Sequence, residues 1–157
     1  MINYIQKATI DARQLSRGLA PMSIETLGLE DAIKILVNDI QNTTDINCYF
    51  EASQPVNISD HTISIQIYRI VQEAVNNAVK HADASNIHIK LINSDHFELT
   101  VSDDGKGFDI ADKKFSKHLG LRIMHYRAGI IGCKLHIESI PGRGTTVYCK
   151  RLYKALQ

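Results

Sequence analysis

Hydrophobic residues recur at helical spacing in four stretches of the chain. Near the N-terminal third, Leu29, Ile33, Leu36 and Ile40 fall on one face of a helix. Apolar side chains three and four residues apart share a face, so we predict an amphipathic helix at each of the four places. The predicted helices are 2–17 (ended by Gly18 and Pro21), 29–42, about 60–81 (capped by Ser59 or Asp60) and 119–131 (ended by Gly132).

Hydrophobic and polar residues alternate along 87–91 and 97–102. Ile87, Ile89 and Leu91, for example, alternate with polar residues, which is typical of a strand with one buried face. Turn residues at 93–96 and 141–144 predict two β-hairpins. The predicted strands are 46–51, 87–91, 97–102, 134–140 and 145–153.

The order of these elements predicts the fold class. After the first helix it reads helix, strand, helix, strand, strand, loop, helix, strand, strand. The usual way to bury such elements is in two layers. We therefore expect an α+β fold, a two-layer α/β sandwich in which helices cover one face of a mixed, mostly antiparallel sheet.

One face of the helix over 60–81 is polar although it lies beside the apolar face. Glu73, Asn77 and Lys80 stand at i, i+4 and i+7, so a carboxylate, an amide and an ammonium group share this face. A polar stripe next to the core can form the floor of a ligand pocket. The alternative is a solvated helix face, and the helix alone does not decide between them.

Strand alternation assigns different directions to two neighbouring aspartates. Asp103 is in phase with the inward-facing Leu99 and Val101, whereas Asp104 is in phase with residues that face water. An inward carboxylate costs several kcal/mol unless a hydrogen bond satisfies it. A ligand amino group, such as that on a heterocycle, could donate this bond. The alternative is a carboxylate that caps the turn.

Glycines mark three further candidate contacts with a ligand. Gly105 and Gly107 follow Asp103 and allow the backbone to approach a ligand closely. Gly120 stands where a helix begins, a place at which backbone N–H groups bind phosphate. The segment 142–146 is by itself only a hairpin turn.

Composition excludes several classes of function. The net charge of +1 leaves no basic surface typical of binding to nucleic acid or acidic lipid. Cys48, Cys133 and Cys149 have neither zinc-site nor disulfide spacing, which predicts reduced thiols and a cytoplasmic location. The chain has no signal peptide and no apolar run near the ~18 residues that cross a bilayer.

The order of the motifs is more specific than any one of them. Glu-x3-Asn-x2-Lys at 73–80, Asp-x-Gly-x-Gly at 103–107, Gly-Leu at 120–121 and Gly-x-Gly-Thr at 142–145 resemble the ATP-binding domain of sensor histidine kinases. Gyrase, MutL mismatch-repair proteins and heat-shock chaperone ATPases belong to the same superfamily. The resemblance covers about 46–153 and implies the Bergerat-type ATP-binding fold.

Finer details resemble the nitrate-sensor type of two-component kinase, namely 73–82, 118–128 and Leu15-Ser-Arg-Gly-Leu-Ala-Pro21 followed by Gly28-Leu29. The resemblance implies that 1–27 is the end of a dimerisation helix with its linker, and that 28–157 is the catalytic domain. The apolar stripe of the helix over 2–17 would then pack on a partner, although docking on its own domain is an alternative.

The resemblance also implies roles for individual residues. Glu73 would be the general base, Asn77 would hold Mg²⁺ between the phosphates of ATP, and Asp103 would accept a hydrogen bond from the adenine amino group. The other implied contacts with the nucleotide are phosphate binding by Lys80 and His81, pocket shaping by Gly105 and Gly107, phosphate binding at Gly120-Leu121 and contact with the adenine end by Thr145.

A histidine kinase also needs an acceptor histidine followed by an acidic residue. None of the seven histidines is followed by Asp or Glu, so we expect the acceptor to lie on a dimerisation domain absent from this chain. The implied partners are that domain in a homodimeric parent and a downstream response regulator, with no nucleic acid and no membrane contact by this chain. The membrane anchoring of the parent is left open.

Two other functions compete with the kinase. An ATPase of the gyrase or chaperone type would use Glu73 to activate water. A degenerate module would use the fold for protein contact alone, which the intact Asn77 and Asp103 oppose. The lysines at 113, 114 and 117 reach phosphate or face solvent; the composition of the loop favours solvent.

Overall fold

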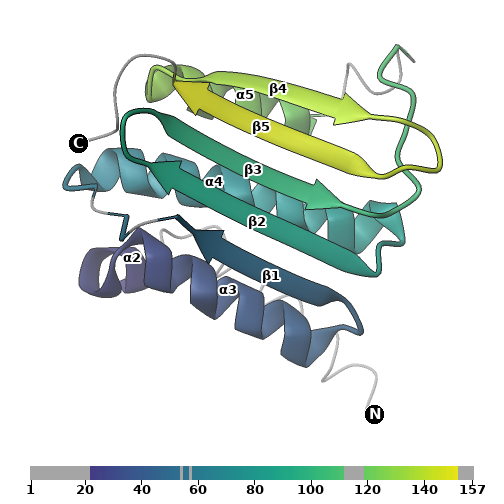
Figure 1. Cartoon of the computed structure of the whole chain (residues 1–157), viewed down its shortest axis with the longest axis horizontal. Coiled ribbons are helices and arrows are strands. Elements are labelled where there is room, and N and C mark those ends of the chain that lie inside the picture. Colours follow the sequence, from purple (N-terminus) through teal and green to yellow (C-terminus); the bar gives the residue numbers. More distant parts are fainter. Residues whose placement is uncertain (1–21, 54, 57, 112–118, 152–157) are drawn as a thin grey trace.

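The computed structural model describes residues 22–53, 55–56, 58–111 and 119–151. In this part of the chain, helices lie against one face of a five-stranded sheet (Figure 1). The prediction of an α+β fold with a mixed sheet is thus confirmed. Outside the described residues lie the predicted helix over 2–17, the lysines at 113, 114 and 117, and residues 152–153 of the last predicted strand.

The elements follow the predicted order, with one short helix in addition. The helices are α2 (Met22–Leu27), α3 (Leu29–Thr43), α4 (His61–Asn77), which continues into a π-helical turn η1 (Ala78–Ala82), and α5 (Leu119–Ile130). The strands are β1 (Asn47–Ala52), β2 (Asn86–Asn93), β3 (Phe97–Asp103), β4 (Lys134–Ser139) and β5 (Thr145–Arg151).

The strand order of the sheet is β1-β2-β3-β5-β4. β1 and β2 are parallel, and all other neighbouring strands are antiparallel. β5 therefore lies between β3 and β4, although it is the last strand in sequence. This order places Thr145 directly opposite Asp103.

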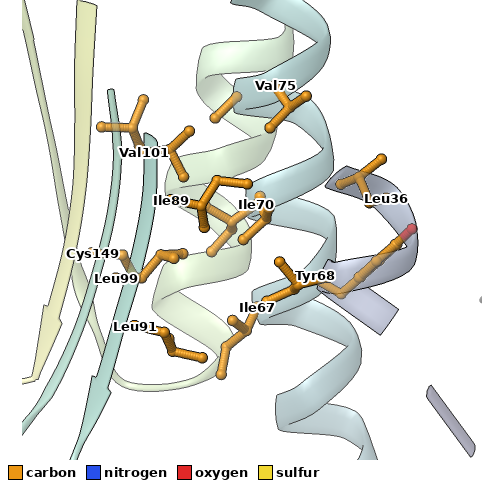
Figure 2. Packing of buried hydrophobic residues seen from close by; sticks show 14 of the residues in the cluster. Leu36, Ile67, Tyr68, Ile70, Val75, Ile89, Leu91, Leu99, Val101 and Cys149 are labelled. Carbon is orange, nitrogen blue, oxygen red and sulfur yellow. The ribbon is translucent and has the colours of Figure 1, made fainter. Parts of the chain in front are cut away.

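The inner face of the sheet packs on the helices through a continuous apolar core. Figure 2 shows Leu99 and Val101 of the sheet pointing toward Ile67 and Ile70 of α4. All four side chains are buried, as strand alternation and helical spacing predict. Burial of this face rigidly attaches the helix that carries Glu73 to the strand that carries Asp103.

The N-terminus of α4 is capped as the sequence predicts. The Asp60 carboxylate accepts hydrogen bonds from the backbone N–H groups of Thr62 (2.8 Å) and Ile63 (3.3 Å). These N–H groups have no acceptor within the helix, so the cap satisfies them. Of Ser59 and Asp60, the structure selects Asp60.

Two features of the helices differ from the sequence prediction. α2 was not expected because it has only six residues and directly follows Pro21; its Ile24 is buried in the common core. The helix over 60–81 is not α-helical throughout. Its last turn is a π helix, and the Ala82 carbonyl accepts a hydrogen bond from Lys106 N–H (2.7 Å) in the loop after β3.

None of the helices in the described ranges is long and apolar enough to cross a membrane. Cys48, Cys133 and Cys149 are all buried free thiols.

Candidate functional site

A cavity of about 340 Å³ opens between α4, η1, the N-terminus of α5 and the ends of β3 and β5. Most of the predicted site residues meet here although they are far apart in sequence. The lining residues are Glu73, Ala74, Asn77, Ala78, His81, Ala82, Val101, Asp103, Gly107, Phe108, Leu119, Gly120, Leu121, Met124, Thr145 and Val147. The cavity thus has a polar group at each end and apolar side chains between them.

The helical side of the cavity presents Glu73 and Asn77 on successive turns. Both side chains are partly buried, as expected for a polar stripe beside the core. The alternative of a fully solvated helix face is therefore ruled out for these two residues. Small alanines at 74, 78 and 82 line the same side and leave room for a ligand.

Of the neighbouring residues Lys80 and His81, only His81 lines the cavity. Both side chains are exposed. The π-helical turn that starts at Ala78 changes the phase of the helix after Asn77. The predicted phosphate contacts of Lys80 and His81 both stay predictions, and of the two only His81 is at the cavity.

Asp103 points into the cavity, as its strand phase predicts. Burial raises the pKa of this carboxyl group, while hydrogen bonds from the backbone N–H groups of Gly105 and Thr145 oppose the shift and the nearby Asp104 charge adds to it. The Gly105 N–H donates to Asp103 Oδ1 at 2.9 Å. These bonds fix the direction of the carboxyl group, which is also accessible from the cavity.

Asp104 faces away from the cavity and holds the loop in place. Its Oδ1 accepts hydrogen bonds from the backbone N–H groups of Ser85 and Asn86, both at 2.8 Å. Its Oδ2 accepts a third bond from Asn86 Nδ2 at 2.7 Å. Asp104 therefore ties the loop after β3 to the first residue of β2 and to the residue before it.

Gly107 and Gly105 have different structural reasons to be glycine. Gly107 lines the cavity at φ +57°, and a Cβ there would overlap the carbonyl oxygen of Ile140. Gly105 is not among the lining residues, and a Cβ there would overlap Ala82. The close approach that the sequence predicts at Gly105 is thus to η1, and its predicted ligand contact stays a prediction.

The N-terminus of α5 lies beside Glu73. A Cβ on Gly120 would overlap Glu73 Oε1, so glycine brings this helix end close to the carboxylate. The first N–H groups of a helix have no acceptor within it and attract anions. With Leu121 also lining the cavity, both predicted residues of this segment are at the site.

The walls of the cavity include residues that the sequence analysis did not select. Phe108, Leu119, Met124, Val101 and Val147 provide apolar surface suited to the faces of a flat ring. Only Val101 and Val147 could have been predicted from the sequence. Each lies two residues from a predicted site residue, Asp103 or Thr145, and so shares its face of the strand. Leu119 and Met124 reach the cavity through the packing of α5, and Phe108 reaches it from the loop after β3.

The donor groups fit a hard cation better than a transition metal. Among the described residues, no three His, Cys, Asp or Glu side chains cluster as possible metal ligands. The Asn77 amide and the Glu73 carboxylate offer oxygens on one helix face. Mg²⁺ takes few protein oxygens together with substrate phosphates, so the Asn77 amide oxygen fits a Mg²⁺–phosphate group and leaves the Glu73 carboxylate free.

Comparison with known proteins agrees with this geometry. Residues 62–155 match the family model described as histidine kinase-, DNA gyrase B-, and HSP90-like ATPase. The chain is 33% identical over 150 residues to the sensor protein VraS of Staphylococcus epidermidis, covering 93% of this chain and 41% of that protein. VraS of Staphylococcus aureus is also 33% identical, with 42% of it covered. The chain thus spans about two fifths of these curated relatives.

Solved structures show the same fold. The histidine kinase domain of the blue-light activated histidine kinase from Erythrobacter litoralis EL346 matches with a TM-score of 0.59 and 26% identity, covering 75% of this chain and 56% of that one. The ATP binding domain of PrrB from Mycobacterium tuberculosis has a TM-score of 0.66 at 20% identity, over 82% and 95% of the two chains. The chain therefore belongs to the histidine kinase-, DNA gyrase B- and HSP90-like ATPase family and carries its ATP-binding domain.

Proposed function

We propose that this chain is the catalytic domain of a two-component sensor histidine kinase. It would transfer the γ-phosphoryl group of ATP to a histidine on the dimerisation domain of its parent. One observation carries the proposal: Glu73 and Asn77 on the helical side face the same cavity as Asp103 on the sheet side. The likeness to sensor proteins supports it, although those relatives extend well beyond this chain.

The two ends of the cavity suit the two ends of ATP. Asp103 would accept a hydrogen bond from the exocyclic amino group of adenine, with Thr145 beside it and apolar side chains against the ring faces. Asn77, His81 and the α5 N-terminus would face the triphosphate. Asn77 would hold Mg²⁺, which neutralises phosphate charge when it is bound.

Glu73 is the candidate general base for the transfer. Its carboxylate lies between Asn77, one turn further along α4, and Gly120 at the start of α5. In the proposed reaction it orients the acceptor imidazole and takes its proton as the new P–N bond forms and ADP leaves. Positioning contributes most to such a transfer, so this carboxylate needs a fixed place.

A kinase of this kind must dock its acceptor domain near the cavity. Leu119, Ile123, Tyr126 and Ile130 lie at i, i+4, i+7 and i+11 of α5, and all four are exposed, with Tyr126 72% exposed. We call these four residues the α5 stripe. It starts at the cavity, because Leu119 belongs to both, and its apolar surface fits a helix of the dimerisation domain.

Several finer assignments belong to the same proposal. The dimerisation helix and linker would occupy 1–27 and the catalytic domain 28–157. A response regulator would receive the phosphoryl group downstream, and the location would be cytoplasmic, in a homodimeric parent. The names of the relatives do not decide the nitrate-sensor type, which stays a prediction.

Calorimetric titration with Mg-ATP tests the nucleotide site. We expect wild type to bind and Asp103→Asn to lose at least tenfold in affinity, because an amide places an N–H donor where a carboxylate accepts. Failure of the wild type to bind Mg-ATP would refute the proposal.

A second assay distinguishes a kinase from an ATPase. A separately produced dimerisation domain with its acceptor histidine is added to the chain and labelled ATP. We expect label on that domain, none on this chain alone, and loss of labelling in Glu73→Gln. Steady phosphate release without any acceptor would instead support the ATPase of the gyrase or chaperone type.

A further inference from the structure

Ser139 is the last residue of β4 and is not among the residues that line the cavity. It is nevertheless partly buried behind the sheet end of the site, with three polar groups around its hydroxyl. Ser139 Oγ accepts a hydrogen bond from Phe108 N–H (2.9 Å), donates to the Gly144 carbonyl (3.2 Å) and lies 2.9 Å from Thr145 Oγ1. Phe108 and Thr145 both line the cavity.

The number of protons limits how these bonds can form together. A serine hydroxyl has one proton and two lone pairs. When that proton goes to the Gly144 carbonyl, the contact with Thr145 requires the Thr145 hydroxyl to be the donor. The two lone pairs of Ser139 then serve Phe108 and Thr145, and every position on the hydroxyl is used. Thr145 keeps only lone pairs for a ligand.

The same serine joins two segments that close the sheet end of the cavity. The loop after β3 and the β4–β5 hairpin also meet through a bond from Gly142 N–H to the Lys106 carbonyl (2.6 Å). A Cβ on Gly107 would overlap the Ile140 carbonyl oxygen, so the two segments are in close contact. Among these contacts, Ser139 is the one that reaches a side chain lining the cavity.

We propose that Ser139 is a positioning residue that makes Thr145 a hydrogen-bond acceptor toward the base of the nucleotide. The inference rests on the proposed function and deepens it by naming a determinant of base selectivity. With Asp103 and Thr145 side by side as acceptors, the site favours a base whose nearest group is an amino donor. A base with a carbonyl oxygen at that place would face the lone pairs of Asp103 and Thr145 and could form no hydrogen bond with them.

Removal of the serine hydroxyl frees the proton of Thr145. In Ser139→Ala, the Thr145 hydroxyl can rotate and donate to a carbonyl oxygen of the ligand. The affinity for ATP should fall while the affinity for ITP, whose base has an oxygen in place of the amino group, falls less or rises. A merely structural role would weaken both nucleotides alike.

The test is calorimetric titration of the full chain with Mg-ATP and Mg-ITP. We expect the ratio of the two affinities to fall about tenfold in Ser139→Ala, the loss of one well-placed hydrogen-bond preference. Ser139→Thr should keep the ratio within about twofold, because it keeps the hydroxyl. Ser139→Cys keeps a side chain of similar shape with weaker hydrogen bonds, so its affinity ratio should lie between those of the alanine and threonine variants. It provides a second measurement if the alanine variant folds poorly.

Two further variants locate the effect. Thr146→Val is the matched control: Thr146 is the next residue on β5, faces away from the cavity and should leave the ratio unchanged. In a Thr145→Val background, Ser139→Ala should no longer change the ratio. An unchanged ratio in Ser139→Ala with wild-type Thr145 overturns the inference. Absence of ATP binding in wild type overturns the proposed function itself.

Discussion

At the scale of single residues, Asp103 and Asp104 show how adjacent carboxylates can have opposite settings. Burial raises the pKa of Asp103 above its value of 3.8 in the unfolded chain. At a pH above 3.8, ionisation of this carboxyl group therefore destabilises the folded state. The Asn86 side chain, with the N–H groups of Asn86 and Ser85, lowers the pKa of Asp104. Asp104 therefore stabilises the folded state at a pH above 3.8, whereas the buried Asp103 at the site destabilises it.

Asp103→Asn should accordingly be more stable than wild type at pH 7, although it loses Mg-ATP affinity. The folded-state pKa of Asp103 is raised, so its unfavourable contribution grows as the pH rises from 3.8 through that value. We expect the melting temperature of the ligand-free variant to rise by roughly 1–3 °C at pH 7, with the difference vanishing near pH 3. A lower melting temperature at pH 7 would contradict this interpretation.

Asp104→Ala should show the reverse pH dependence without involving the ligand directly. It removes three hydrogen bonds, from Ser85 N–H, Asn86 N–H and Asn86 Nδ2. We expect the melting temperature to fall by about 3 °C at pH 7. The pKa of Asp104 in the folded state is lowered below 3.8. The difference in melting temperature between wild type and variant should therefore shrink as the pH falls below 3.8 and through the folded-state pKa. Thermal scans of both proteins between pH 7 and pH 3 measure it.

At the scale of elements, α4 combines a structural end with a functional end. Asp60 caps its N-terminus about three and a half turns before Glu73. Asp60→Ala should therefore lower the free energy of unfolding by about 1 kcal/mol and leave the affinity for Mg-ATP within twofold. Denaturant titration and calorimetry measure the two quantities. A large loss of affinity would mean that the cap also positions the site.

The contact between Gly120 of α5 and Glu73 of α4 leads to a second prediction. Gly120→Ala places a Cβ where Glu73 Oε1 lies, and the flexible carboxylate must move away. We expect phosphoryl transfer to fall at least tenfold, because the general base is displaced. The Mg-ATP affinity should change by less than about threefold, because alanine keeps the backbone N–H that faces the phosphates and the adenine end of the cavity is untouched. Gly129→Ala on the same helix is the control, since its Cβ would have nothing within 4 Å. Equal effects of the two substitutions would exclude a specific role for Gly120.

At the scale of the whole molecule, local sequence patterns predicted the helices and strands better than the contacts between distant segments. Alternation placed Asp103 inward correctly because a strand has one buried face. Helical spacing put Lys80 on the face of Glu73 and Asn77, whereas in the structure, where the helix ends in a π turn, His81 and not Lys80 lines the cavity. The Ala82 carbonyl of that turn accepts a bond from Lys106 N–H, 24 residues away, which no local pattern reveals. The position of β5 between β3 and β4, which brings Thr145 opposite Asp103, likewise depends on the packing of distant segments.

The same limit explains why Ser139 and the α5 stripe emerged only from the structure. Nothing in the sequence around Ser139 separates it from other strand residues, and its importance comes from contacts with Phe108 and Thr145. The residues of the α5 stripe have ordinary helical spacing. Their exposure follows from the fact that Met124 and Ala128 occupy the buried face of the same helix.

The α5 stripe gives the prediction that concerns the molecule and its partner together. Tyr126→Glu places a charge in the middle of the proposed docking surface without touching the cavity, where Tyr126 is not a lining residue. Burying that charge against an apolar helix would cost several kcal/mol, so transfer to the separate dimerisation domain should fall more than tenfold. The affinity for Mg-ATP should stay within twofold.

His125→Glu is the matched control, because His125 is exposed on the same helix but lies outside the α5 stripe. It should transfer at close to the wild-type rate, which separates a local charge effect from a general change in net charge. Wild-type transfer by Tyr126→Glu would mean that the acceptor domain docks elsewhere on the molecule. Reduced transfer that is restored by raising the concentration of the dimerisation domain would identify the loss as one of docking, because excess partner compensates for weaker association but not for a damaged catalytic site.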